Sequence, residues 1–522
     1  MKSLKKNARV ILILFLVLFT VLVGYFVYAL NTYGNRWLTN PYNVRLQNQK
    51  SSVIPGKILD RNSVVLAGVN EEGEREYTSD RATRKALSHI IGDNYGLTSS
   101  GAESFFANYL LGMDTNLFER LAQSFSGQSA QGSSVMLTVD AELTEYASEV
   151  LGDYQGVVVM MNYKTGELLV STSHPMFDPK HMEAYLPESQ GGTNDAPEGD
   201  STLVNRATAG QYTPGSVFKI ITAAAAIRYL PGIESRTFDC TGPLAFDYDS
   251  GRYLSSVQIS EEEDKQNKEN ERSTATPPPE GEEEMVEETD GKNYKWVRDY
   301  QSSYHGELTL EKAFAKSCNT TFARIGMELG AQKLAKMAAE FGIGTDFVFK
   351  DIILYGSQFV KGSNDYELAW SSVGQYKDLI TPLHLCLISA AIANDGQMME
   401  PKLLKGVINS RNYYTAYLKP KVYSKPLTEL EAKKMQKLMI SVVESGTGTN
   451  AAISGYTVGG KTGTAEVSND KSVAANAWFT GFVLDGDHPL AIAVVLEKGG
   501  SGGGKAAPIA QKILKKAIKL GY

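Results

Sequence analysis

The stretch QYTPGSVFKIITAAAAIRYL, at residues 211–230, places a Pro-Gly chain break directly before an alanine-rich segment. We expect a helix to begin at Ser216, which puts Lys219 on the same helix face about one turn away. A lysine desolvated beside a serine can take the proton from its hydroxyl, and a helix N-terminus offers free amides to a developing oxyanion. The stretch therefore predicts a nucleophilic serine at a helix start.

Ser-x-x-Lys is a weak signal when it stands alone. The same spacing begins at Ser3 and at Ser468, and a serine that opens a helix is more often only a cap. A second motif, Ser317-Cys318-Asn319, follows further along and separates two helical halves. Its hydroxyl and amide can relay a proton and hold a substrate amide, while Cys318 is expected to be a small buried hydrophobic residue.

The third motif is the Lys-Thr-Gly that begins at Lys461, inside GYTVGGKTGTAEV. On a strand at the edge of a cleft, the Lys461 ammonium and the hydroxyls of Thr462 and Thr464 can bind a substrate carboxylate. Gly463 allows the strand backbone to approach a ligand closely. The segment therefore predicts a carboxylate-binding strand.

A second copy of this tripeptide begins at Lys164, in NYKTGELL. It lies between two apolar runs, a pattern typical of a β-hairpin with Gly166 in the turn. We interpret Lys164 and Thr165 as solvated turn residues that take no part in chemistry.

Two further patterns indicate other enzyme classes. Residues 455–462 match the phosphate-binding pattern GxxxxGK[ST] in full, but that loop must open a helix and a strand-like segment follows here, so a P-loop NTPase is a remote alternative. A Gly-x-Ser-x-Gly elbow at residues 499–503 lacks a later histidine, because the last histidine is His488. We interpret its glycines as making the loop flexible before the final helix.

Strand-like runs occur at both ends of the region that carries the three motifs. A hairpin is expected within residues 156–173, and three strand-like runs within residues 456–498. Mostly helical segments lie between them, and an amphipathic helix closes the chain at residues 507–522. A sheet built from both ends of a domain with helices inserted between predicts an α+β fold.

The N-terminus predicts a membrane anchor. Basic residues within 1–9 precede an unbroken apolar run at 10–30, which as a helix matches the thickness of a bilayer core. The charge asymmetry predicts a cytoplasmic tail and a catalytic domain outside the cytoplasm. A cleaved signal peptide is the alternative, but this run is longer than the apolar region of a signal peptide.

Composition divides the rest of the chain. We expect a small N-terminal domain at residues 31–133 and a larger domain at residues 134–522, with a disordered, solvated acidic insertion at residues 260–292. The chain's net charge of −7 is concentrated in this insertion, which leaves the remainder slightly basic. The charge argues against a general nucleic-acid binder.

Metal-ligating residue types show no recognisable spacing. The three cysteines, Cys240, Cys318 and Cys386, form neither a disulfide framework nor a CxxC pair, and the six histidines are scattered without HExxH. The sequence therefore predicts neither a metal nor another cofactor.

Taken in order, the three motifs resemble the active-serine set of penicillin-binding proteins and β-lactamases. The segments NPYNVR, GKILDRN, LTVDAEL, NRATAGQYTPGSVFK, SCNTTFARIG and GGKTGTAE make nearly the whole chain similar to a class B penicillin-binding protein, a membrane-anchored peptidoglycan D,D-transpeptidase. The resemblance implies a five-stranded antiparallel sheet between helices, after a transmembrane helix and a small pedestal domain. Pro55 and Ser63 depart from the family, which usually has Arg and Gly there.

The resemblance implies a role for each catalytic residue. Ser216 would attack the penultimate D-Ala carbonyl of a D-Ala-D-Ala stem peptide, with Lys219 as its base. Ser317 would pass a proton towards the leaving amine, and Asn319 would hold the peptide and Lys219. An amine of a neighbouring stem peptide would then resolve the acyl-enzyme, and β-lactams would acylate the same serine.

The resemblance also implies how the substrate is held. Lys461 would contribute to catalysis and, with Thr462 and Thr464, would receive the terminal carboxylate beside Gly463. The backbone amides of Ser216 and Thr464 would form the oxyanion hole.

The implied partners are peptidoglycan stem peptides, β-lactams, the bacterial plasma membrane and a separate glycan polymerase. A class A bifunctional enzyme would need a glycosyltransferase domain, and too few residues precede the transpeptidase region for one. The alternative within the family is a catalytically weak or inactive scaffold, or a β-lactam sensor.

Overall fold

The computed structural model describes most of the chain. The described residues are 2–38, 53–113, 130–197, 199–255, 258, 294–299, 303–417, 419–468, 470 and 472–522. The acidic insertion at 260–292 and the NPYNVR segment at 40–45 lie outside them.

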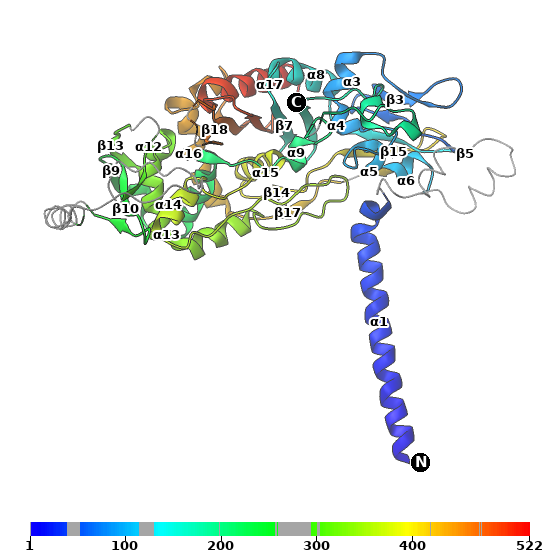
Figure 1. Cartoon of the computed structure of the whole chain (residues 1–522), viewed down its shortest axis with the longest axis horizontal. Helices are drawn as coiled ribbons and strands as arrows, with labels where there is room; N and C mark the ends of the chain where they lie inside the picture. The colour runs from blue at the N-terminus through cyan, green and yellow to red at the C-terminus, as the bar shows by residue number, and fades with distance from the viewer. Residues whose placement is uncertain are drawn as a thin grey trace, which may run out of the picture.

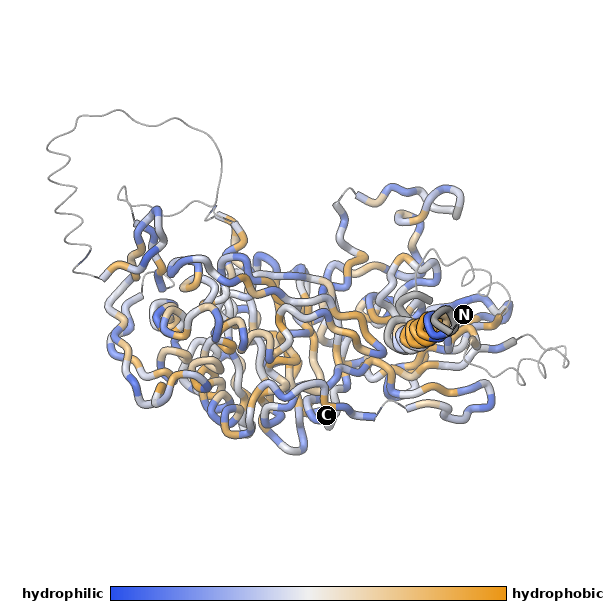
Figure 2. The backbone as a smooth tube through the Cα atoms, turned by 90° about the horizontal axis from the view of Figure 1, so that it is seen from below, coloured by the Kyte–Doolittle hydropathy of each residue, from blue (hydrophilic) through white to orange (hydrophobic). Residues whose placement is uncertain are grey.

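A single long helix forms the N-terminal part, α1 (Lys2–Leu38). Among the described residues it is the one helix long and apolar enough to cross a membrane, over Lys6–Leu30. It extends away from the rest of the molecule, and its apolar stretch is the continuous orange segment of the tube view (Figures 1 and 2). Its exposed apolar side chains fit the expected membrane anchor at 10–30.

A five-stranded antiparallel sheet organises the larger part of the molecule, in the order β18-β19-β20-β7-β8. It joins strands from both ends of the region, which confirms the α+β prediction. Both faces of the sheet are covered, so the strands are nearly continuously apolar. The strands are β7 (Gly156–Asn162), β8 (Leu168–His174), β18 (Val458–Ala465), β19 (Asn476–Val483) and β20 (Leu490–Leu496).

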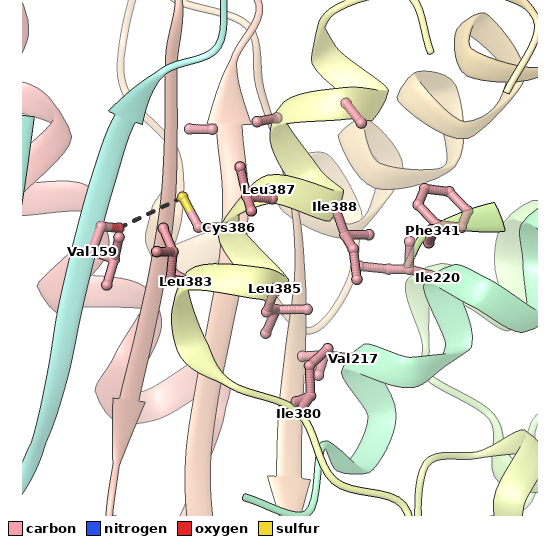
Figure 3. Packing of buried hydrophobic residues seen from close by; sticks show 14 of the residues in the cluster. Val159, Val217, Ile220, Phe341, Ile380, Leu383, Leu385, Cys386, Leu387 and Ile388 are labelled. Carbon is pink, nitrogen blue, oxygen red and sulfur yellow. Dashed lines mark hydrogen bonds between the residues drawn. The ribbon is translucent and has the colours of Figure 1, made fainter. Parts of the chain in front are cut away.

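The alternation of side chains along each strand divides the core into two layers. Val158 of β7 packs with α8 (Ala141–Leu151) and α17 (Ala507–Lys519) on one face. Val159 faces the other layer, where α15 (Pro382–Ala393) packs against the sheet. Figure 3 shows this second layer, with α15 lying against β7. The sheet is therefore a rigid platform between helices.

The remaining helices and small sheets lie mainly beside the second layer. A three-stranded sheet has the order β11-β10-β12, and β9 pairs with β13. These elements are α9 (Arg206–Ala209), α10 (Lys219–Tyr229), β9 (Thr237–Cys240), β10 (Leu244–Asp247), β11 (Tyr253–Leu254), β12 (Tyr294–Val297), β13 (Gly306–Thr309), α12 (Leu310–Ala315), α13 (Asn319–Glu340), α14 (Asp365–Ser372), β14 (Met398–Met399), β17 (Val422–Ser424) and α16 (Glu429–Ser445).

A six-stranded sheet connects the N-terminal region with the larger domain, in the order β16-β15-β6-β2-β3-β4. Its members are β2 (Ile58–Leu59), β3 (Val65–Val69), β4 (Arg75–Tyr77), β6 (Ser134–Leu137), β15 (Leu404–Ile408) and β16 (Tyr414–Tyr417). The sheet contains strands from both sides of residue 133, so the domain boundary there stays a prediction. The other N-terminal elements are β1 (Val53–Ile54), α3 (Arg81–Ala86), α4 (Ser88–Ile91), α5 (Ala102–Phe105), α6 (Ala107–Leu110) and β5 (Ala130–Gln131).

The β2–β3 hairpin forms although serine replaces the family's usual glycine in its turn. Ser63 has a φ of +69°, in the left-handed region that favours glycine. The buried Asp60 carboxylate holds the turn by accepting hydrogen bonds from the amides of Asn62 and Val64, each at 2.8 Å. The carboxylate thereby compensates for the unfavourable backbone at Ser63.

Candidate active site

Ser216 lies in a tight turn that packs against the end of β18. The turn is a 3₁₀ helix, Gly215–Phe218, and not the first turn of an α-helix as the sequence predicts. Its first amide donates to Gly374 O at 2.8 Å, which holds the turn against the segment that follows α14. The φ at Gly215 is +57°, and a Cβ there would lie 2.7 Å from Thr464 O. Glycine is therefore required for Ser216 to sit this close to β18.

Lys219 begins α10 and is fully buried beside Ser216. Its Nζ lies 3.2 Å from Ser216 Oγ and 3.3 Å from Ser317 Oγ. It also donates to Ser317 O at 2.5 Å and to Asn319 Oδ1 at 2.6 Å. One amine thus contacts all the other polar side chains of the first two motifs.

Burial changes the protonation of this amine. Desolvation lowers the pKa of Lys219 to about 8, and the nearby Asp299 carboxylate opposes the shift. A pKa near the working pH makes a substantial fraction of the amine neutral, as a general base requires. The site can therefore take the proton from Ser216.

The Ser317–Asn319 turn is held by its own backbone and by Asp299. Ser317 has a φ of +59°, and α13 begins at the following asparagine, with Cys318 as its N-cap. The Asn319 amide N–H donates to Asp299 Oδ1, and its side-chain Nδ2 donates to Arg298 O at 2.7 Å. The second bond orients the side chain so that Oδ1 faces Lys219.

Cys318 is buried, as the sequence predicts. Burial, together with the Asp299 carboxylate, raises the pKa of the Cys318 thiol to about 11. A thiol that stays protonated is a poor nucleophile, so it does not compete with the serine.

Lys461 also contacts the Ser317 hydroxyl. It lies in the middle of β18, and its Nζ donates to Ser317 Oγ at 2.9 Å. Burial and the positive charge of Lys219 hold the pKa of Lys461 well below its usual value. The Ser317 hydroxyl therefore bridges two buried amines, which gives a continuous polar path from Ser216 to β18.

The residues after Lys461 are fixed by close backbone packing. Thr462 shares a hydrogen bond with the hydroxyl of Thr447, with 2.5 Å between the oxygens. A Cβ at Gly463 would lie 3.0 Å from Pro214 O, so the Ser216 turn and β18 approach closely there. Thr464 pairs with Ala477 of β19 and is half-buried.

The glycine-rich segment at 499–503 differs from the flexible loop that the sequence predicts. Three of its four glycines are closely packed, and Gly500 has open space around it. A Cβ at Gly502 would lie 2.3 Å from Gly463 O, and one at Gly503 would lie 2.3 Å from Thr447 O. The segment packs against β18 at Gly463. Ser501 caps a π-helical turn, because its side chain accepts a hydrogen bond from Gly504 N.

The other Lys-Thr-Gly copy is a turn, as predicted. Lys164 is exposed, and its amide and that of Thr165 donate to Asn162 Oδ1. Gly166 has a φ of +82°. The P-loop alternative fails on the later copy, because residues 458–465 form one strand and no helix opens after Lys461.

Sequence reasoning missed two residues that support the site. Asp299 holds the Asn319 amide, and Thr447 holds the Thr462 hydroxyl. Asp299 comes just after the acidic insertion and Thr447 lies in a Gly-Thr-Gly loop, and neither position has a spacing that relates it to the three motifs.

A half-buried serine against a buried lysine, a second serine and a strand lysine defines the active-serine class of acyl-transfer proteins. The penicillin-binding protein transpeptidase domain matches residues 156–229 and 281–515. The chain belongs to this family and is a class B penicillin-binding protein.

Individual relatives agree with this assignment. The chain is 28% identical over 502 residues to the peptidoglycan D,D-transpeptidase PbpA of Mycolicibacterium smegmatis, covering 92% of each chain. Penicillin-binding protein A from M. tuberculosis, as a ceftriaxone acyl-enzyme complex, matches with a TM-score of 0.73 and 25% identity over 91% of this chain and 100% of that chain. Its penicillin G acyl-enzyme complex matches with a TM-score of 0.71 and 25% identity over 89% and 99%.

Proposed function

We propose that the protein is a peptidoglycan D,D-transpeptidase that uses Ser216 as its nucleophile. The observation that carries the proposal is the position of Lys219 Nζ, within 3.3 Å of the hydroxyls of both Ser216 and Ser317. The ceftriaxone and penicillin G acyl-enzyme complexes solved for the M. tuberculosis relative support a covalent reaction of this chain with β-lactams.

The acylation step follows from this contact. Neutral Lys219 accepts the hydroxyl proton as Ser216 Oγ forms a bond to the carbonyl carbon of the penultimate D-Ala. Lys219 then returns this proton through Ser317 to the nitrogen of the terminal D-Ala, and the amide C–N bond breaks with Lys219 neutral again. D-Ala leaves as an amine, and the stem peptide remains as an ester on Ser216.

Deacylation reverses the same proton path. The amine of a neighbouring stem peptide attacks the ester carbonyl and loses a proton through Ser317 to Lys219. The proton returns to Ser216 Oγ as the ester bond breaks, and a new amide joins the two peptides. Asn319 keeps Lys219 oriented during both steps through its 2.6 Å hydrogen bond.

We propose that side chains of β18 bind the terminal carboxylate of the substrate. The Lys461 amine, whose protonated form a bound carboxylate would favour, and the hydroxyls of Thr462 and Thr464 bind the terminal carboxylate of the donor. The amides of Ser216 and Thr464 donate to the oxyanion. The close packing of Gly215 against Thr464 O supports this pairing, because it brings the two amides to one edge.

We assign the catalytic region to the outer side of the bacterial plasma membrane. The basic residues before Val10 support a cytoplasmic N-terminus, with α1 as a single membrane span. We also propose that a separate glycan polymerase makes the polymer that carries the stem peptides, and that this protein cross-links its product.

An inactive scaffold or a β-lactam sensor is the second candidate. Against the scaffold stands the full burial of Lys219 and Lys461. Burying two amines beside each other is unfavourable for stability, and such an arrangement persists where function requires it.

A donor with a D-Ala-D-Ala-type thioester and an amine acceptor tests the proposal on the purified full chain. We expect thiol release and acceptor transfer, measured by mass spectrometry, and loss of both in Ser216→Ala. Labelling of Ser216 by penicillin without turnover of the donor would favour the sensor or scaffold.

A further inference from the structure

Four metal-ligating side chains converge behind the Ser317–Asn319 turn. They are Cys240 at the end of β9, Asp299 after β12, His305 before β13 and Cys318 at the start of α13. Their ligand atoms all lie within 4.8 Å of one another. Both thiols and the carboxylate are buried, and the His305 ring is half-buried.

The distances between the ligand atoms fit one particular geometry. Cys240 Sγ lies 3.3 Å from Asp299 Oδ2 and 3.5 Å from His305 Nδ1. His305 Nδ1 lies 3.6 Å from Asp299 Oδ2, and Cys318 Sγ lies 3.4 Å from the same oxygen. Zinc bonds of about 2.0 to 2.3 Å in a tetrahedron separate the ligand atoms by roughly 3.3 to 3.8 Å. These four separations therefore match edges of a zinc tetrahedron.

We propose that Cys240, Asp299, His305 and Cys318 bind one Zn²⁺ ion as a closed tetrahedral site. Two thiolates and an imidazole select a borderline-soft ion over Mg²⁺ or Ca²⁺, which prefer oxygen ligands. Four protein ligands leave no open position for substrate or water, so the ion is structural. The inference departs from the expectation of no metal, and it does not depend on the proposed catalytic activity.

The hydrogen bonds around the cluster suit thiolate ligands. Thr320 Oγ1 lies 3.2 Å from Cys318 Sγ and 3.3 Å from Cys240 Sγ. It also donates to Asp299 Oδ2 at 3.0 Å. Partners of this kind orient the ligands of a metal site and tune their charge.

The ion would position the active-site turn. Cys318 stands between Ser317 and Asn319, and Asp299 divides its two oxygens between the cluster and the Asn319 amide. Zinc on Cys318 and Asp299 thus fixes both the left-handed backbone at Ser317 and the start of α13. The four ligands are positioning residues, since no hydrogen bond from them to Ser216 is found among the described residues.

The site also ties together distant parts of the chain. Cys240 precedes the acidic insertion at 260–292, and Asp299 and His305 follow it. Closing a long loop by a metal clip stabilises the folded state by restricting the unfolded chain. The ion would therefore anchor both sides of the insertion next to α13.

Metal content tests the proposal directly. The full chain, purified in detergent micelles under reducing conditions, is incubated with zinc chloride, desalted and analysed by plasma mass spectrometry. We expect one zinc ion per chain, lost in Cys240→Ala and in His305→Ala. Cys386→Ala is the matched control, because Cys386 is a buried cysteine of α15 outside the cluster, and it should retain the ion. A folded wild-type chain without zinc would overturn the proposal, as would an intact mass that shows a Cys240–Cys318 disulfide.

Cobalt substitution tests the ligand set itself. Co²⁺ in the wild-type site should give thiolate-to-cobalt charge-transfer bands together with the visible bands of tetrahedral coordination. Cys240→Asp keeps a ligand but removes one thiolate, so it should bind Co²⁺ with about half of the charge-transfer intensity. Unchanged intensity in this variant would contradict ligation by Cys240.

The positioning role is tested by rescue. In chains that remain folded by circular dichroism, Cys240→Ala should lower the rate of acylation by fluorescent penicillin on the order of tenfold. Cys240→Asp loaded with Zn²⁺ should recover most of this rate. Equal rates in the wild-type chain with and without zinc would contradict the positioning role, even if the ion binds.

Discussion

The two Lys-Thr-Gly tripeptides belong to the same five-stranded sheet but occupy different positions in it. Lys164 lies in the turn between β7 and β8, where it is exposed. Lys461 lies inside the edge strand β18, fully buried and 2.9 Å from Ser317 Oγ. The two identical tripeptides therefore have different roles, because the turn exposes the Lys164 amine to water and the edge strand places the Lys461 amine against the Ser317 hydroxyl.

The glycines show the same contrast. Gly166 is required by the left-handed backbone of a turn, with a φ of +82°. Gly463 allows Pro214 O and Val217 to lie 3.0 Å from the position that a Cβ would take. One glycine serves the local fold, and the other serves the contact between two elements of the active site.

The lysine pair gives the largest expected difference. Lys461→Met should slow acylation by penicillin on the order of 100-fold, because the buried amine that binds the carboxylate is lost. The same change should raise the melting temperature, since a desolvated amine is replaced by an apolar chain. Lys164→Met should leave acylation within about twofold. Stopped-flow labelling and differential scanning calorimetry measure both quantities, and equal effects of the two changes would break the comparison.

The pH dependence should be the next largest effect. The neutral amine of Lys219 is the base and its pKa is about 8, so the acylation rate should rise with pH and level off above this value. Below it, the rate should fall about tenfold per pH unit. Lys164→Met should reproduce the wild-type profile, whereas a wild-type rate that is flat between about pH 6 and about pH 8 would exclude Lys219 as the base.

Substitutions of Gly166 and Gly463 should separate an effect on folding stability from an effect on the acylation rate. A Cβ at Gly166 would lie 2.2 Å from Glu400 O, so Gly166→Ala should destabilise the fold by about 2 kcal/mol while the folded protein acylates normally. Gly463→Ala should slow acylation more strongly, because its Cβ pushes β18 away from the Ser216 turn. Urea unfolding and labelling rates are the measurements, and normal acylation in Gly463→Ala would show that the close approach is not needed.

The smallest effect is expected at Ser63, far from either copy. Ser63→Gly relieves a φ of +69° and should stabilise the protein by about 1 kcal/mol. Acylation should not change, which would show that stability alone does not alter the chemistry of β18. A lower unfolding midpoint in urea would mean that the Ser63 side chain contributes a contact worth more than the strain.

The order of the three motifs predicted most of the candidate site. The sequence places Ser216, Ser317 and Lys461 on separate segments, and the α+β pattern brings both chain ends into one sheet. The structure brings these residues together as expected. The 3₁₀ turn at Ser216 could not be predicted, because the contacts that hold it, such as the hydrogen bond from Gly215 to Gly374 O, come from distant segments.

Contacts between distant segments explain the other misses. β15 joins the six-stranded sheet with β6 and β2, a pairing that no local pattern indicates. The cluster of Cys240, Asp299, His305 and Cys318 has no recognisable spacing, since Cys240 ends β9 and the other three residues follow the acidic insertion. Gly502 and Gly503 lie against the backbone of Gly463 and Thr447, and their own sequence does not indicate this contact.

The most direct test of the account is covalent labelling of the purified protein by a fluorescent penicillin, followed by peptide mass mapping. We predict a single adduct on Ser216 that disappears in Ser216→Ala and persists in Lys164→Met. An adduct on another residue, or none on folded protein, would contradict the assignment of Ser216 as the nucleophile.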